Sequence, residues 1–295
     1  YNTGSNNTAS GVYSLEDNTT GYNNTATGYG ASQANTTGFQ NVVNGAYALF
    51  TNTTGTNNIA IGYQSLYANT TGANNVAVGD NALYSNTASQ LVAVGSSALY
   101  ANTTGTVNTA VGFHSLMNNT TGSTNSAFGY YALRSNTTGA TNNSLGVNTL
   151  YSNTTGSQNN AVGYASLQNN TTGYRNSAFG SYALFTNTTV SNLTAIGHQA
   201  LYSNTTGTGN VATGYQALYS NTTGYSNVAV GYQSMLNTTT GVNSVAVGNN
   251  TLLSNTTGGS NAAVGLSALQ NNTTGGGNIA VGQSSLWGNT TGSYN

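Results

Sequence analysis

Short apolar clusters alternate with polar turn segments at a fixed spacing along the whole chain. The glycine that ends each Ala-Val-Gly-like triplet recurs at every seventeenth position from Gly11 to Gly282, and only the interval between Gly79 and Gly95 is shorter, by one position. With that glycine as position 1, the unit reads roughly Gly-Tyr-Gln-Ala-Leu-Tyr-Ser-Asn-Thr-Thr-Gly-x-x-Asn-x-Ala-Val. Self-similarity of this kind predicts one small structural unit that is stacked many times.

The unit is too short for a pair of helices and lacks the i, i+3, i+4, i+7 spacing of an amphipathic helix. It contains two segments of strand length, Asn-x-Ala-Val-Gly and Ala-Leu-Tyr-Ser-Asn, separated by turn residues. We therefore predict an all-β protein, a parallel β-solenoid or β-roll of 17-residue coils with about 17 repeats. We expect one rod-shaped domain over residues 1–295 that is a segment of a longer fibre, because the chain enters and leaves in mid-unit.

Restricted positions within the unit indicate which side chains are interior. Position 5 is Leu in 15 of 17 copies and position 16 is Ala in 15 copies, which predicts a thin core of Leu and Ala rows. Position 17 alternates with position 16 and is apolar in 13 copies, so it predicts an apolar stripe on the outer surface. Such a stripe favours self-association into a trimer or a laterally packed fibril. The opposite assignment, with the Val row inside and the Ala row outside, stays open.

Two units depart from the turn pattern. The short unit has Ser89 where the turn glycine is expected, and another unit has Val190 there. A kink or a bulged turn is expected at both.

Only 2% of the residues are charged and the formal net charge is −1, which matches the predicted stacking. A charge repeated in every coil would meet its own kind about 4.8 Å away. The same composition provides no basic patch for nucleic acid and no apolar run long enough for a membrane span. We expect no enzyme activity, cofactor or metal site, because the acidic, basic and His residues are few and scattered. They are Glu16, Asp17, Asp80, His114, Arg134, Arg175 and His198.

Asn-Thr-Thr recurs at position 8, and each copy satisfies the Asn-x-Ser/Thr acceptor motif for N-glycans. Two interpretations stay open, because Asn and Thr before Gly also favour a tight turn. In a secretory pathway the motifs predict covalent N-glycans. The second Asn, at position 14, predicts an internal ladder of amides instead. The candidate glycosylation sites are Asn18, Asn35, Asn52, Asn69, Asn102, Asn119, Asn136, Asn153, Asn170, Asn187, Asn204, Asn221, Asn237, Asn255, Asn272 and Asn289, of which Asn237 is shifted by one position.

Three segments of the Asn-x-Ala-Val-Gly type, residues 58–62, 75–79 and 278–282, resemble the head repeats of YadA-like trimeric autotransporter adhesins. Similar repeats occur in phage tail-fibre proteins. The resemblance implies a left-handed parallel β-roll that trimerises side by side and binds host surface molecules. The usual unit of that family is shorter than the unit of this chain, so the extra residues fall in the Asn-Thr-Thr-Gly segment.

The main functional hypothesis is a non-catalytic structural or adhesive fibre, located outside the cell or on a cell or virion surface. Its predicted partners are other copies of itself and a cell-surface or glycan target. The alternative is an ice-binding solenoid that uses Thr ladders such as Thr103 with Thr104 and Thr222 with Thr223. A carbohydrate-binding module built on Tyr rows is less favoured, because the Tyr row at position 2 is interrupted by Asp80.

Overall fold

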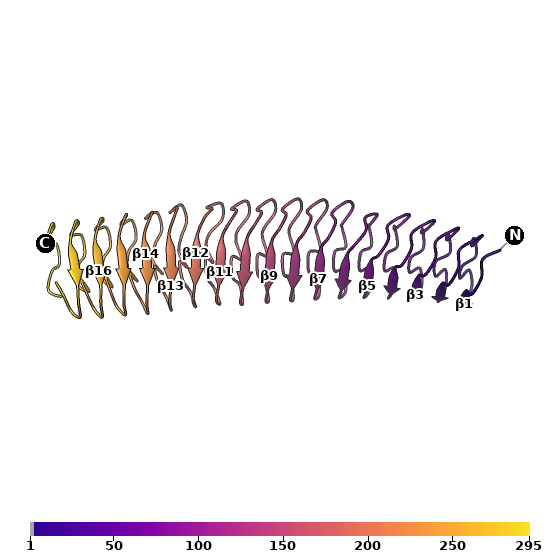
Figure 1. Ribbon diagram of the computed structural model, residues 1–295, viewed down its shortest axis with the longest axis horizontal. Coiled ribbons are helices and arrows are strands. Elements are labelled where there is room, and N and C mark those ends of the chain that lie inside the picture. The colour runs from indigo at the N-terminus through magenta and orange to yellow at the C-terminus, as the bar shows by residue number, and fades with distance from the viewer. Residues whose placement is uncertain (1–2) are drawn as a thin grey trace. The chain divides into compact units, whose positions relative to one another are not determined.

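The computed structural model describes residues 3–295 and divides the chain into two compact units, residues 1–145 and 146–295. Each unit is a stack of the same short coil, and each coil adds one strand to a parallel sheet (Figure 1). No helix occurs within residues 3–295. The predicted all-β parallel solenoid is therefore confirmed. A single domain over residues 1–295 stays a prediction, and Tyr1, where the sequence enters in mid-unit, lies outside the described residues.

Each coil contains one short strand at positions 15 to 17. Neighbouring strands pair in parallel with identical positions opposite one another, as Val228 is opposite Val245 and Ala229 is opposite Ala246. In the first unit the strands are β1 (Thr8–Ser10), β2 (Thr25–Thr27), β3 (Val42–Asn44), β4 (Ile59–Ile61), β5 (Val76–Val78), β6 (Val92–Val94), β7 (Thr109–Val111), β8 (Ser126–Phe128) and β9 (Asn143–Leu145). In the second unit they are β10 (Asn160–Val162), β11 (Ser177–Phe179), β12 (Thr194–Ile196), β13 (Val211–Thr213), β14 (Val228–Val230), β15 (Val245–Val247), β16 (Ala262–Val264) and β17 (Ile279–Val281).

The second predicted strand, Ala-Leu-Tyr-Ser-Asn, is wrong, because this segment is a chain of turns. Positions 3 and 5 have left-handed backbone, with φ of 54° at Gln216 and 51° at Leu218. These bends turn the chain back within a single short coil, which a straight strand at this place would not do. Pairing between coils continues through the turns, since the amide N–H of Leu218 donates to the carbonyl of Ser234 in the next coil at 3.0 Å.

The predicted core is confirmed by the burial of the two restricted rows. Leu218 and Ala229 are 0% exposed, whereas Val230, next to Ala229 on the same strand, is 36% exposed. The same alternation holds in β15, where Ala246 is buried and Val247 is exposed. The alternative with the Val row inside is therefore wrong. Ala fits this interior because the coil is so thin that little space separates its two walls.

Two rows of buried Asn side chains connect the coils, and both rows bind the carbonyl of the turn glycine at position 11. Asn52 Nδ2 donates to Gly55 O at 3.1 Å and to Asn35 Oδ1 in the preceding coil at 2.8 Å. Asn41, at position 14 of the preceding coil, donates from Nδ2 to the same Gly55 oxygen at 3.0 Å. Its backbone N–H also donates to Asn24 Oδ1 at 3.0 Å. The predicted internal amide ladder at position 14 is confirmed, and position 8 forms a second one.

The short unit is accommodated by the loss of one Thr, which corrects the expected role of Ser89. Ala88 takes the place of the turn glycine, because its carbonyl accepts from Asn86 Nδ2 and Asn75 Nδ2, both at 2.9 Å. Val190 fills the same place in its own coil, and its carbonyl accepts from Asn176 Nδ2 at 2.8 Å. The amide bonds to position 11 persist in both coils, since the acceptor is a backbone oxygen that every residue has. The two Asn rows are interrupted here, because position 14 is Leu91 in one coil and Leu193 in the other, and Asn69 Oδ1 and Asn187 Oδ1 have no hydrogen-bond partner.

Replacement of Leu218 by Asp should destabilise the protein far more than replacement of Gln216 by Asp. The first change places an unpaired carboxylate in the closed core and costs about 4 kcal/mol or more. The second removes only hydrogen bonds in a partly exposed Gln row, where Gln216 Nε2 donates to Gln199 Oε1, and costs about 1 kcal/mol. Urea unfolding of the two variants measures the difference. Equal losses of stability would contradict the assigned faces.

Candidate functional site

The outward side chains of β14–β17 form a continuous apolar surface, here called the Val face. Its members come from positions 15 and 17 and alternate with the buried Ala row. None is charged, and Ile279 and Val281 are the most exposed of them. The parallel register brings like side chains together in neighbouring coils, which gives the face its regularity. The Val face comprises Val228, Val230, Val245, Val247, Ala262, Val264, Ile279 and Val281.

Glu16 and Arg175 each hydrogen-bond to a neutral Gln side chain of a neighbouring coil. Glu16 Oε2 accepts from Gln33 Nε2 at 2.6 Å, and Arg175 Nε donates to Gln158 Oε1 at 2.8 Å. Burial, and then the nearby Arg134 charge, lower the pKa of His114 below its ordinary value. Among residues 3–295 no group of three His, Cys, Asp or Glu side chains lies close enough to hold a metal ion. The same residues include no helix of the length and apolarity needed to cross a membrane.

Fourteen of the sixteen candidate glycosylation sites are buried Asn residues of the position 8 ladder. In Asn221, for example, Nδ2 donates to Asn204 Oδ1 at 2.9 Å and to Gly224 O at 3.0 Å, so both of its hydrogens are in use. An N-glycan would replace one of these hydrogens inside the coil, where no space is available. Asn289 is partly exposed. Attachment of glycans stays a prediction, and the folded coil restricts where they fit.

Asn237 differs from the other candidates because its side chain is exposed. The shift of one residue places Thr238 in the ladder, where its Oγ1 accepts from Asn255 Nδ2 at 3.4 Å. An Asn at this place would donate its side-chain N–H to Asn221 Oδ1, but Thr238 has no amide. Asn221 Oδ1 therefore has no hydrogen-bond partner. The shift was visible in the sequence, and the structure shows that it turns Asn237 outward.

The two Thr residues at positions 9 and 10 form two rows along the coils that differ in hydrogen bonding, and the position 10 row is here called the free row. Most of the position 9 hydroxyls donate to the next coil, as Thr222 Oγ1 does to Thr239 O at 3.1 Å. The position 10 side chains are all exposed, and their hydroxyls have no hydrogen-bond partner within residues 3–295. In the first unit the free row is Thr20, Thr37, Thr54, Thr71, Thr104, Thr121 and Thr138, and in the second it is Thr155, Thr172, Thr189, Thr206, Thr223, Thr240, Thr257, Thr274 and Thr291.

Aromatic side chains at position 6 form face-to-face stacks that the sequence analysis did not identify. Phe50, Tyr67, Tyr84 and Tyr100 stack in succession with ring centroids 5.1 to 5.3 Å apart and interplanar angles of 4° to 7°. Burial, and then the neighbouring phenols, raise the pKa of Tyr84. Rings in such a stack cover one another's faces and present only their edges to solvent. They are therefore poor platforms for a sugar, although the recurrence of aromatic residues at the coil period would have located them.

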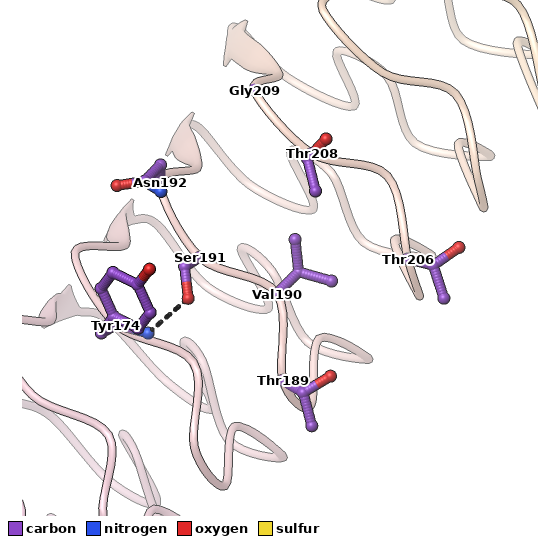
Figure 2. A pocket seen from close by; sticks show the side chains of 8 residues that line it. All are labelled: Tyr174, Thr189, Val190, Ser191, Asn192, Thr206, Thr208 and Gly209. Atoms are coloured by element: carbon purple, nitrogen blue, oxygen red, sulfur yellow. Dashed lines mark hydrogen bonds between the residues drawn. The ribbon is translucent and has the colours of Figure 1, made fainter.

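One pocket of about 600 Å³ lies on the turn edge of the second unit. It is lined by residues from positions 10 to 13 of three consecutive coils, in one of which Val190 replaces the turn glycine, and Tyr174 lies at one end (Figure 2). Ser191 lines the pocket beside Tyr174, and its Oγ accepts a hydrogen bond from the Tyr174 backbone N–H at 3.0 Å. The lining residues are Tyr174, Thr189, Val190, Ser191, Asn192, Thr206, Thr208 and Gly209.

No family model matches the chain, and no curated protein matches it at a significant level.

Asn221 and Asn237 provide a matched test of the ladder, because both begin an Asn-Thr-Thr tripeptide. Asn221→Asp loses both donated hydrogen bonds and buries a charge, so we expect a loss of about 3–5 kcal/mol in unfolding free energy. Asn237→Asp changes an exposed side chain and should stay within about 0.5 kcal/mol of the wild type. Denaturant unfolding at neutral pH measures both. Similar values for the two variants would show that the ladder does not stabilise the coil.

Proposed function

We propose that this protein is a non-catalytic structural or adhesive fibre component, and that copies associate through the Val face. The observation that carries the proposal is the outward placement of eight neutral, largely β-branched side chains on one face. Contiguous apolar surface of this kind is typical of protein–protein contacts. Coil stacking already satisfies the backbone, so the face remains available for a second function.

The near absence of charge supports contact between copies. Only 2% of the residues are charged, and none is on the Val face, so two copies can approach without desolvating ions. Sheets that pack face to face lie about 10 Å apart and interdigitate their side chains. Each coil of the Val face presents a similar apolar surface to a second copy, which suits a trimer or a laterally packed fibril.

A location outside the cell or on a cell or virion surface fits a fibre of this kind. Burial of the N-glycan acceptor Asn residues limits which route to the surface is compatible with the fold. A pathway that attaches N-glycans before folding would compete with formation of the position 8 ladder at fourteen sites. A route to the surface without N-glycosylation leaves the ladder intact, whereas exposed Asn237 tolerates a glycan.

The double variant Val230→Asn, Val247→Asn should separate the assembly and leave the coil folded. Both side chains face outward and are 36% and 37% exposed, so the Asn amides remain in water when the copies dissociate. Circular dichroism should retain the wild-type strand signal, while sedimentation velocity should show smaller particles.

The matched control is Thr223→Asn, Thr240→Asn, which places the same amides on the turn edge of the same coils. This control should sediment like the wild type. Wild-type protein that sediments as a monomer at all concentrations, or a double variant that assembles normally, would refute association through the Val face.

Ice binding is a second candidate, and the free row of position 10 hydroxyls favours it. In the second unit a regular row of exposed Thr side chains, one per coil, offers methyl and hydroxyl groups at a constant spacing. Most position 9 hydroxyls do not add to that array, because they are bonded to the next coil, as in Thr205 and Thr222.

If the free row binds ice, the wild-type protein should produce thermal hysteresis, and Thr223→Tyr, Thr240→Tyr should reduce it. The two rings would project from the row and prevent close contact with a flat crystal surface. Thr213→Tyr on the strand side is the control and should keep full hysteresis. Absence of hysteresis in the wild type would exclude this candidate.

A further inference from the structure

The pocket on the turn edge exists because two consecutive coils have small side chains where their neighbours have rings. Along position 12 of the second unit the residues are Tyr174, Ser191, Thr208 and Tyr225 in successive coils. Gly209 at position 13 removes a further side chain from the wall. The resulting volume of about 600 Å³ lies within the range of small-molecule sites.

The ring of Tyr174 lies at one end of this pocket (Figure 2). At the same position in the first unit, Tyr22 is covered by Phe39, with centroids 4.7 Å apart and an interplanar angle of 5°. Tyr174 is followed by Ser191 and has no stacked ring partner within residues 3–295. The Arg175 guanidinium lies over this ring, 5.7 Å from the centroid, and its Nε donates to Gln158 Oε1 in the preceding coil. Tyr174 is 47% exposed.

The rest of the lining is neutral and rich in hydrogen-bonding groups. Thr189 and Thr206 belong to the free row of hydroxyls, and the Asn192 side chain is exposed at the opposite side (Figure 2). The lining residues include no ionisable group apart from the phenol of Tyr174. An anion or a cation would therefore find no counter-charge in the lining, whereas a polyhydroxylated neutral molecule would find donors and acceptors on several sides.

We propose that this pocket binds a neutral carbohydrate, with the C–H face of one sugar ring against Tyr174 and its hydroxyls bonded to the Thr and Asn side chains. A single open aromatic face beside neutral hydroxyl and amide groups is the arrangement that matches a pyranose ring, which has an apolar face and a polar rim. The site uses the turn edge and no residue of the Val face. Binding of sugar is thus separate from the association of copies.

Ligand-observed saturation-transfer NMR with cellobiose, maltose and lactose tests the proposal on the full chain. At least one disaccharide should receive saturation from the wild-type protein. Tyr174→Leu should raise the dissociation constant roughly tenfold, as expected for loss of one aromatic contact. Thr208→Tyr should abolish binding, because it places a ring in the pocket where Tyr225 of the next coil can stack on it.

Tyr215→Leu is the matched control, since the Tyr215 ring is covered on both sides by His198 and Tyr232. It should bind like the wild type, and circular dichroism should show the same strand signal for all variants. No saturation transfer to any of the three sugars, or equal binding by Thr208→Tyr and the wild type, would overturn the proposal. Sedimentation of the Tyr174→Leu variant should match the wild type, so failure of this site leaves the proposed association untouched.

Discussion

The carbonyl of the turn glycine is the point on which the coil depends. It accepts from the Asn at position 8 of its own coil and from the Asn at position 14 of the preceding coil, as Gly55 does from Asn52 and Asn41. A Cβ on Gly55 would collide with the Asn52 amide oxygen and with the backbone of Gly72. The same carbonyl therefore closes one coil and attaches it to the preceding coil. Without this acceptor the buried Asn amides would lack a hydrogen-bond partner, which would lower the stability of the fold.

This arrangement explains why the chain is neutral and finely repetitive. A ladder position requires a side chain that both donates to and accepts from its own copy one coil away, and Asn meets this requirement where Asp or Lys would not. Thr238 shows the effect of a departure, because the Asn221 oxygen next to it has no partner. Small interior side chains such as Ala229 follow from the same geometry, since the ladders hold the two walls of the coil close together.

The sequence was sufficient to predict the solenoid and the buried Leu and Ala rows, because burial restricts each of these rows to one kind of side chain. The outward Val row followed from its alternation with the Ala row along the strand. The sequence did not predict the turns at positions 2 to 7, where residues such as Leu218 adopt left-handed backbone without being Gly. The alternation of apolar and polar residues at these positions is similar to that of a strand. The acceptor motif at position 8 was ambiguous for a related reason: a sequence records that Asn221 can hydrogen-bond, and only the fold shows that its partners are internal.

Separation of ladder and surface positions lets the coil vary without losing its fold. The pocket illustrates this, because Val190 replaces the turn glycine there while the Asn187 amide keeps its bond to the carbonyl at that place. Asn176 still donates to the Val190 carbonyl, since a backbone oxygen is present whatever the side chain. Outward positions of consecutive coils can therefore change together and create a local site. In a fold of this kind, function is to be sought where successive coils differ from the consensus, since their common features are required for stacking.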